Sequence, residues 1–231
     1  MCGRSSLTKT EKELEELFNA SFYSDDLERY NPLPNFNVCP THITPVITNQ
    51  DKEHFNAFRW GLIPFWAKDE KIGYKMINAR VETVLEKNSY KKLVGNKRCI
   101  VPFDGFYEWK KTPKGKQPYR IVTKDREVFT IAGLWDRWQS PEGEVIHSFT
   151  LLTQDANKLV AEIHNRMPAI LNKEQEEIWL SDDLAPEEII KIIEPYPEDA
   201  MEAYPVSKQV NNVRNNNPSL IVKELEPPTL F

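Results

Sequence analysis

The sequence predicts an α+β fold: a single compact domain over residues 1–231, whose mainly antiparallel sheet forms a distorted barrel with peripheral helices. Three observations support this prediction. Runs of alternating apolar and polar residues are separated by turn residues, the helical patterns among them are short, and neither an internal repeat nor a linker divides the chain. The Asn- and Pro-rich residues from about 217 onwards are expected to form a peripheral tail.

The first third of the chain predicts one helix and three short strands. Thr10 and Glu13 form a capping box, and apolar residues behind them recur at helical spacing, which predicts a helix over 11–20. Residues 24–34 are polar and Pro-rich and indicate a loop. Residues 61–75 hold a proline, a glycine and exposed-looking aromatics, which is typical of a long functional loop. Extended segments are expected at 36–38, 43–48 and 55–60.

The middle of the chain predicts two β-hairpins. Asn88 or Ser89 is expected to cap a short helix that ends at Gly95. A turn over 113–118 joins the strands of the first hairpin, and residues 140–143 join those of the second. The expected strands are 98–103, 106–111, 119–124, 128–135 and 145–153.

The last third predicts three short helices. Gln154 or Asp155 is expected to cap a helix that passes through Ile163 and stops before Pro168. Two further helices are expected at 172–180 and 186–193, the second with proline at its start.

Composition excludes several classes of protein. The chain is 40% hydrophobic and 28% charged, which is not the composition of a disordered protein. No apolar run approaches the roughly 20 residues that span a bilayer, and no secretory signal precedes the domain, so we expect a cytoplasmic protein with no membrane partner. Three scattered cysteines are too few for a disulfide framework.

Charge is unevenly distributed along the chain. The whole sequence has 30 Lys and Arg against 35 Asp and Glu, but residues 87–126 carry 12 basic against 3 acidic side chains, and residues 173–202 carry 2 against 11. One interpretation is a basic face that binds nucleic acid, and the other is two ordinary solvated surfaces.

Cys2 directly follows the initiator Met. Removing Met1 would leave an α-amine and a thiol on adjacent carbons, a pair that no internal cysteine offers. The amine condenses with an aldehyde to an imine, and the thiol then closes a five-membered thiazolidine ring. The alternative is that position 2 belongs to an ordinary variable terminus.

Two further residues are candidates for proton transfer. Glu108 alternates with Phe106, Tyr107 and Trp109, so an inward-facing carboxyl would have a raised pKa suited to general acid work, whereas an outward-facing one would be solvated. His164 is expected at the end of a helix beside an arginine, where it suits acid–base work or remains an ordinary surface histidine.

Other segments are ambiguous when each is taken alone. Asn78 and Arg80 point to one side if their segment is extended. The aromatic residues of 60–66 suit either stacking on unpaired bases or an ordinary core. Cys39 and His42 have the spacing of half a metal site, but no second pair completes it, so no metal is expected.

Seven segments carry a specific pattern when taken together and in order. They are Met1-Cys2-Gly3-Arg4, Asn37-Val38-Cys39-Pro40, Trp60-Gly61-Leu62-Ile63-Pro64-Phe65-Trp66, Ile77-Asn78-Ala79-Arg80-Val81-Glu82-Thr83, Gly105-Phe106-Tyr107-Glu108-Trp109, Ile163-His164-Asn165-Arg166-Met167-Pro168 and Pro205-Val206-Ser207. This set closely resembles the SRAP family, the SOS response-associated peptidases, from Cys2 to about Asn216.

The resemblance implies a sensor and shield of abasic sites in single-stranded DNA, acting in the DNA damage response of a bacterium or phage. In this family the N-terminal cysteine forms a thiazolidine crosslink with the aldehyde of the ring-opened sugar, and crosslink formation and reversal are lyase-like chemistry. No cofactor or metal is implied, and a monomer is expected. The family name implies a peptidase that removes Met1 itself, although a host aminopeptidase could also do so.

The resemblance also implies roles for individual residues. Cys2 would be the nucleophile through its amine and thiol, and Asn78 would hold the cysteine and the sugar. Glu108 would be the acid–base carboxylate near the amine, and His164 would assist sugar ring opening. The implied DNA-binding residues are Arg4, Arg80 and Arg166 at phosphates and Pro40 and Trp66 at bases.

Two other functions remain open at this point. One is a cysteine peptidase that acts on other proteins, with Cys2 as nucleophile and His164 as base. The other is a non-covalent reader of single-stranded DNA or of modified bases, which would need the basic and aromatic surface but not Cys2.

Overall fold

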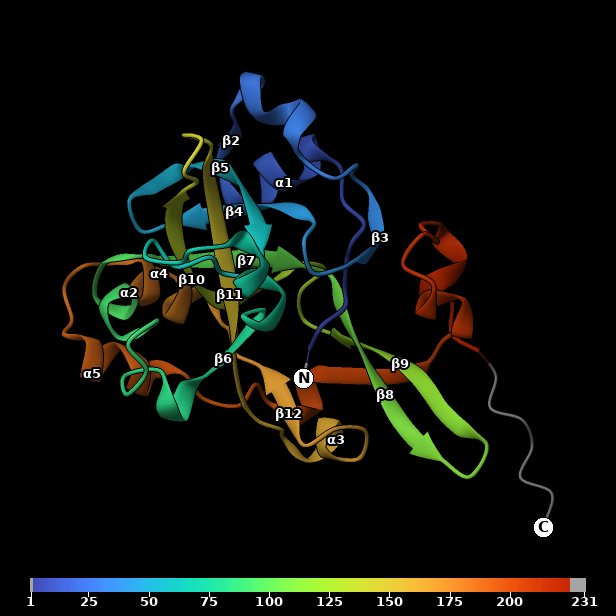
Figure 1. Cartoon of the computed structure of the whole chain (residues 1–231). Helices are drawn as coiled ribbons and strands as arrows, with labels where there is room; N and C mark the ends of the chain where they lie inside the picture. Colours follow the sequence, from blue (N-terminus) through green and yellow to red (C-terminus); the bar gives the residue numbers. More distant parts are fainter. Residues whose placement is uncertain (1, 225–231) are drawn as a thin grey trace, which may run out of the picture.

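The computed structural model describes residues 2–224 and shows two β-sheets with helices around them (Figure 1). Met1 and residues 225–231 lie outside the described residues, so the predicted removal of Met1 and the end of the predicted tail do too. In Figure 1 the helices α2, α4 and α5 lie along one side of the larger sheet, and a long hairpin projects on the other side.

The larger sheet closes into a five-stranded barrel. Neighbouring strands are antiparallel around it, and a short parallel pairing of Ser148 with Arg59 and of Phe149 with Trp60 joins the two ends. The barrel strands, in order, are β11 (Val145–Asp155), β10 (Phe129–Gln139), β7 (Arg98–Phe103), β4 (Ile43–Thr48) and β5 (Asp51–Trp60). The predicted distorted barrel is therefore confirmed.

Short strands extend the barrel at its edges. β2 (Ser21–Phe22) pairs with β5, and β13 (Ile170–Leu171) pairs with β10. β6 (Asn78–Arg80) and β12 (Arg166–Pro168) both pair with β11, one on each side of it.

The second sheet is wholly antiparallel and contains the beginning of the chain. Its strands, in order, are β14 (Met201–Pro205), β9 (Gly115–Thr123), β8 (Gly105–Thr112), β1 (Ser5–Leu7) and β3 (Asn35–Val38). β7 runs into β8 through Asp104 alone, so the two sheets share one corner.

Within the described part of the chain, residues 2–224, five short α-helices and several 3₁₀ turns cover the sheets. The α-helices are α1 (Glu11–Phe18), α2 (Lys91–Asn96), α3 (Lys158–Ala161), α4 (Lys173–Leu180) and α5 (Pro186–Ile189). The 3₁₀ turns are Ser24–Arg29, Glu70–Lys75, Val81–Thr83, Ile190–Ile192, Glu198–Ala200, Lys208–Asn211 and Pro218–Ile221.

Aromatic side chains fill the barrel. Trp60 stacks on Phe149, with ring centroids 6.4 Å apart, and Phe103 packs against Trp60 at 6.1 Å; all three are fully buried. A smaller cluster seals the second sheet beneath the C-terminal residues and includes Tyr107 and Leu220. Residues 217–224 therefore pack on the domain through at least one buried side chain.

The corner between the sheets is held by a buried ion pair. Arg120 of β9 lies 2.9 Å from Asp104, both side chains are almost fully buried, and Ser6 of β1 donates to the same carboxylate oxygen at 2.5 Å. Breaking a buried ion pair is costly because it leaves an uncompensated charge. Since Ser6 of β1 binds the same carboxylate, the pair also holds β1 beside β8.

Most predicted elements are confirmed, and several end as predicted. Strands 43–48 and 98–103 match β4 and β7, and the capping box of Thr10 and Glu13 begins α1. The predicted loop over 24–34 instead contains the 3₁₀ turn Ser24–Arg29.

The predicted caps of two helices are wrong. Neither Asn88 nor Ser89 caps α2, which follows Tyr90 without any side-chain cap bond. Neither Gln154 nor Asp155 caps α3, because β11 continues through both residues to pair with β12, and Asn157 caps α3 instead.

Two other boundaries also differ from the predictions. Because α3 ends at Ala161, His164 lies in the loop between α3 and β12, not at the end of a helix. The turn predicted over 113–118 is shorter, because β9 begins at Gly115, where φ is +107°.

Among residues 2–224, no helix has the length and apolar character that a bilayer crossing requires. In the same part of the chain, no group of three or more His, Cys, Asp or Glu side chains could hold a metal ion.

Gly105→Ala should destabilise the protein by about 2–4 kcal/mol in urea unfolding, because a Cβ there would lie 2.6 Å from Nε of Arg120 and push this side chain away from Asp104. Gly95→Ala is the matched control. Its Cβ would meet only Pro186, at 3.6 Å, and better helix propensity should leave stability equal or raise it by up to about 1 kcal/mol. Equal stability of the two variants would show that the corner contact is weak.

Candidate functional site

The structure brings four of the sequence-predicted site residues together at the start of the chain: Cys2, Asn78, Glu108 and His164. Figure 1 shows the dark blue segment ahead of β1 reaching the region between β6, β8 and β12. Cys2, Arg4 and Glu108 belong to the second sheet or lead into it, Asn78, Arg80, His164 and Arg166 lie on or beside β6 and β12, and Pro40 and Trp66 lie in loops.

Cys2 is held in place by a hydrogen bond between the two sheets. The side-chain amide of Asn78 donates to the carbonyl oxygen of Cys2 at 2.7 Å, and the thiol lies 3.9 Å from the hydroxyl of Ser5. The cysteine is fully buried. Burial, reinforced by the charge of Glu108, raises the pKa of the thiol to about 12, so the sulfur is protonated at neutral pH.

Glu108 faces inward on β8. Its side chain is 3% exposed, and it pairs across the ladder with Tyr119 of β9. Burial raises the pKa of the carboxyl above its usual range, and the charge of His164 acts in the opposite direction. Of the two orientations that the sequence allowed, the structure shows the buried one, in which the carboxyl holds its proton to higher pH than a solvated glutamate does.

His164 is oriented by the backbone that follows it. Its Nδ1 accepts a hydrogen bond from the backbone N–H of Arg166 at 3.0 Å. An imidazole that accepts at Nδ1 carries a hydrogen on Nε2, so this contact orients the Nε2–H as a hydrogen-bond donor.

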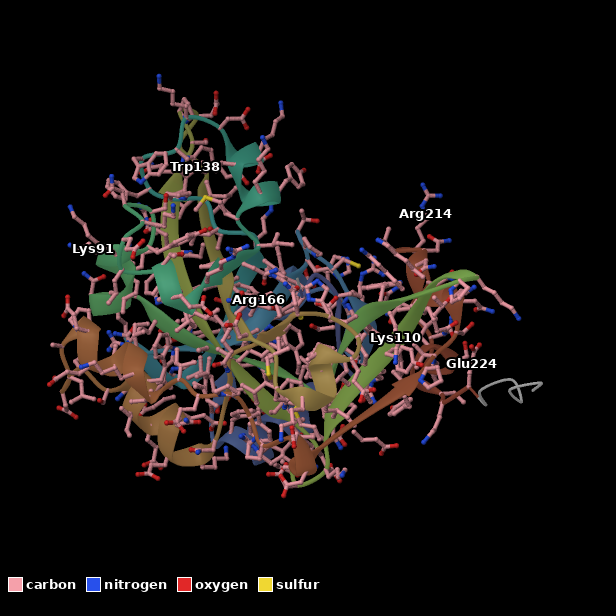
Figure 2. All side chains as sticks on the ribbon, turned by 90° about the horizontal axis from the view of Figure 1, so that it is seen from below. Lys91, Lys110, Trp138, Arg166, Arg214 and Glu224 are labelled. Carbon is pink, nitrogen blue, oxygen red and sulfur yellow. The ribbon has the colours of Figure 1, made fainter. Side chains whose placement is uncertain are left out.

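Arg166 is surrounded by acceptors. Its two terminal nitrogens contact the two carboxylate oxygens of Glu82 at 2.7 and 2.9 Å, and one of them also contacts Asp155 at 2.7 Å. The carbonyl of Thr153 accepts at 2.6 Å. Figure 2 shows Arg166 in the middle of the face that contains β12 and α3.

Arg4 is fixed by the C-terminal part of the chain. Its Nη1 donates to the side-chain oxygen of Asn37 at 2.8 Å and to the carbonyl of Val210, and its guanidinium lies 5.8 Å from the ring centre of Trp109. The amide of Asn37 donates to the carbonyls of Asn212 and Asn215 at 3.1 and 2.8 Å. Residues 210–215 therefore hold Arg4 two positions after Cys2.

The remaining predicted residues are more open to solvent. Arg80 is exposed at the end of β6, and Pro40 is half-buried. Trp66 is 50% exposed and Phe65 is 64% exposed. Both aromatic side chains line a groove of about 340 Å³ that also contains Lys91 and Lys92.

A close glycine contact shapes the loop that carries Trp66. Gly61 has φ of +121°, and a Cβ there would lie 2.7 Å from the carbonyl oxygen of Gly73. The backbones at the two ends of the loop can therefore come this close only because Gly61 has no side chain.

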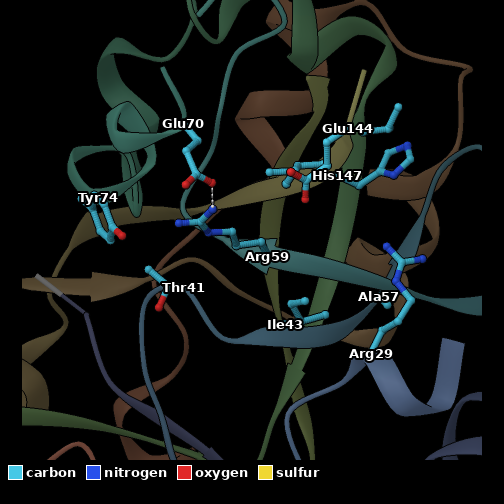
Figure 3. A pocket seen from close by; sticks show the side chains of 11 residues that line it. Arg29, Thr41, Ile43, Ala57, Arg59, Glu70, Tyr74, Glu144 and His147 are labelled. Carbon is cyan, nitrogen blue, oxygen red and sulfur yellow. Dashed lines mark hydrogen bonds and ion pairs between the residues drawn. The ribbon is translucent and has the colours of Figure 1, made fainter. Parts of the chain in front are cut away.

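A larger pocket of about 470 Å³ lies away from the nine predicted residues, none of which lines it (Figure 3). Arg59 and Glu70 form an ion pair at 2.5 Å within it, and Tyr74 lies beside Arg59. His147 stacks on Phe58, and burial lowers the pKa of its imidazole. Arg59 and Glu70 therefore neutralise each other, and Arg29 pairs with Asp26, which lies outside the lining.

Sequence reasoning missed three residues that bind predicted site residues. Glu82 and Asn37 stand in the quoted segments but received no role, and Asp155 was interpreted as a helix cap. A buried Arg needs anionic or carbonyl partners, so acidic side chains near Arg166 could have been sought, but the strand pairing that brings Asp155 to it was not visible in the pattern.

The arrangement has three chemical features. An N-terminal backbone carbonyl is held by an amide, a buried carboxyl with a raised pKa lies beside it, and an imidazole acts on that carboxyl electrostatically. Arg4 and Arg80 follow Cys2 and Asn78 two positions later, whereas the exposed Phe65 and Trp66 line a groove with Lys91 and Lys92. Such a site can transfer protons at the N-terminus while binding an anionic chain with unpaired bases.

Comparisons with known proteins identify relatives of this chain. A curated relative, the abasic site processing protein YoqW of Bacillus subtilis (strain 168), is 45% identical over 224 residues, covering 96% of this chain and 99% of its own. The abasic site processing protein HMCES of Gallus gallus is 37% identical and covers 82% of this chain and 66% of its own.

Solved structures share the fold. A protein from Bacteroides thetaiotaomicron superposes with a TM-score of 0.89 at 31% identity and covers 97% of this chain and 100% of its own. A protein from Bordetella bronchiseptica superposes with a TM-score of 0.75 at 26% identity and covers 89% and 100%. The family model described as SOS response associated peptidase (SRAP) matches residues 1–213. The chain therefore belongs to the SRAP family.

Proposed function

We propose that this protein processes abasic sites in single-stranded DNA by forming a reversible thiazolidine crosslink through Cys2 after Met1 is removed. The observation that carries the proposal is the fixed position of Cys2, whose carbonyl is bound by Asn78 and whose thiol lies close enough to Glu108 for the carboxylate to raise its pKa. The curated relatives named above are called abasic site processing proteins, which supports the general part of this proposal.

The reaction begins at the amine. Because the pKa of the Cys2 thiol is raised to about 12, the sulfur is a poor nucleophile before substrate binds. The freed α-amine attacks the C1′ aldehyde of the open sugar and gives a carbinolamine, and loss of water gives an imine.

The thiol then closes the ring. Sulfur forms a bond to the former aldehyde carbon, the S–H proton leaves through a base, and the imine nitrogen gains a proton. The net reaction joins an aldehyde and an aminothiol into a thiazolidine with release of one water.

Glu108 and His164 supply the proton transfers. The buried carboxyl of Glu108 takes a proton from the α-ammonium and returns one to the departing hydroxyl. The Nε2 proton of His164 is available to the ring oxygen of the closed sugar, whose opening releases the aldehyde.

Single-stranded DNA is the proposed partner because arginines follow both Cys2 and Asn78, and because the exposed Phe65 and Trp66 line a groove that also contains two lysines. Arg4, Arg80 and Arg166 are proposed to meet phosphates, and Trp66 and Pro40 to pack on bases beside the lesion. An unpaired strand leaves the sugar accessible, whereas a duplex would have to open first.

Two competing functions make different predictions. A cysteine peptidase would cleave a labelled peptide without a free α-amine, and a non-covalent DNA reader would tolerate loss of Cys2.

Removal of Met1 by the protein itself is part of the proposal. The unaltered protein, expressed without methionine aminopeptidase and purified, should still lose Met1, as mass spectrometry would show.

Cys2→Ala should abolish the heat-stable adduct with a single strand that contains one abasic site, because no ring closes without sulfur. Cys2→Ser should give only an imine that borohydride traps. Denaturing electrophoresis measures both, and Cys39→Ala serves as the matched cysteine control. A heat-stable adduct of Cys2→Ala without reductant would refute the proposed chemistry.

Glu108→Gln should slow both formation and reversal of the crosslink by about 10²–10⁴-fold, because the same proton transfers run in both directions. Burial raises the pKa of Glu108, so its titration should place a limb of the wild-type pH–rate profile above pH 4.5, and this limb should disappear in the variant. Single-turnover time courses and a trap-strand chase measure the rates. Wild-type rates in both directions would remove Glu108 from the mechanism.

Arg80→Gln should weaken binding to all single strands similarly and reduce the slope of log K against log salt by about 0.7, because one phosphate contact is lost. Fluorescence anisotropy over a salt series measures this slope. Arg137, which is exposed on the β10–β11 hairpin opposite His147, is the matched control, and Arg137→Gln should leave the slope unchanged.

A further inference from the structure

Arg166 has no exposed donor left for a phosphate. A guanidinium has five N–H groups, and the four on its terminal nitrogens are occupied by Glu82, Asp155 and Thr153. The fifth, on Nε, is buried and has no acceptor among the described residues. A phosphate can therefore bind this arginine only by displacing one of its present partners.

The carboxylates lie on the solvent side of the arginine. The Arg166 side chain is 9% exposed, whereas the side chains of Glu82 and Asp155 are 45% and 86% exposed. Of the three partners, the carbonyl of Thr153 belongs to β11 and cannot leave without breaking the sheet. The two carboxylates are side chains at the surface and can rotate away.

Glu82 binds Arg166 in the way that a phosphate would. Two parallel N–H···O contacts at 2.7 and 2.9 Å form the bidentate pair that guanidinium makes with carboxylate and phosphate alike. Glu82 also lies near Arg80, whose charge contributes to the lowered pKa of this carboxyl. One acidic side chain thus faces two of the arginines that are proposed to bind phosphates.

The strand pairing makes this arrangement a fixed feature of the site. Arg80 of β6 lies opposite Thr153 of β11, and Asp155 of β11 lies opposite Arg166 of β12. Glu82 follows β6 directly in the turn Val81–Thr83. Arg80, Arg166, Glu82 and Asp155 together carry no net charge, so this part of the DNA-binding surface attracts a phosphate chain only weakly.

We propose that Glu82, assisted by Asp155, is a specificity-determining residue that occupies the phosphate-binding edge of Arg166 in the free protein and keeps the affinity for undamaged single strands low. This inference rests on the proposed function. An intact strand must displace Glu82 with no covalent gain, whereas a strand with an abasic site is retained by the crosslink. Selectivity for the lesion therefore comes from weak binding before the covalent step.

The test measures binding of a fluorescein-labelled oligothymidine, which has no lesion, by anisotropy over a salt series. Glu82→Gln should bind about fivefold more tightly at low salt and show a slope steeper by about 0.7, because one more phosphate is neutralised. Asp155→Asn should show a smaller gain, because Asp155 makes one contact and is mostly exposed. Glu86→Gln removes an equal charge from an exposed side chain and is the matched control.

A double-mutant cycle separates competition at Arg166 from general charge repulsion. In an Arg166→Gln background, Glu82→Gln should improve binding by at most about twofold, the screened effect of one surface charge. A fivefold gain that persists without Arg166, or unchanged or weaker binding of Glu82→Gln, would overturn the proposal. Misfolding cannot imitate the expected result, because it does not tighten binding.

Crosslinking assays keep this inference separate from the proposed function. With an abasic strand and excess intact competitor, Glu82→Gln should lose crosslinking yield to the competitor more than wild type does. If wild type crosslinks but the competitor affects both proteins equally, the inference fails alone. If wild type forms no crosslink at all, the proposed function fails, and the anisotropy data still decide whether Glu82 competes with phosphate.

Discussion

One strand, β11, determines the arrangement of the whole molecule. Along one edge it pairs first with β5, which closes the barrel, and then with β6; along the other it pairs with β10 and then with β12. Both edges change partner near the same end of the strand. Because hydrogen-bonded neighbours lie about 4.8 Å apart, this exchange brings β6 and β12, and the polar residues they carry, to one end of a closed apolar barrel.

The start of the chain reaches the end of the barrel that carries β6 and β12, because β1 belongs to the second sheet and is positioned by it. The buried pair of Asp104 and Arg120 fixes the corner where β7 becomes β8, and β1 follows β8 along this corner. Asn78 then binds the carbonyl of Cys2 across the gap between the sheets. Cys2 lies beside a chain terminus, usually the least ordered part of a protein, yet it is fully buried and hydrogen-bonded, which is the precondition for chemistry at an N-terminal residue.

The barrel and most strands could be predicted from the sequence because alternation and turn residues are local signals. The 11-residue β11 was predicted to end at 153, since Gln154 and Asp155 are good cap residues; their pairing with β12 depends on contacts that no local pattern records. The site residues could be named from ordered segments and a family resemblance. The acidic partners of Arg166 could not be predicted, and neither could the hydrogen bond from Arg4 to the side-chain oxygen of Asn37. Each contact joins residues that are far apart in the sequence and meet only in the folded chain.

The burial of Cys2 has a consequence for chemical durability. Oxidation by peroxide and alkylation by electrophiles both require a thiolate, and a thiol with a pKa of about 12 supplies almost none at neutral pH. The same burial excludes bulky reagents from the sulfur. The residue on which the proposed crosslink depends is therefore preserved under oxidative stress, a condition that itself generates damaged DNA bases and the abasic sites that follow from them.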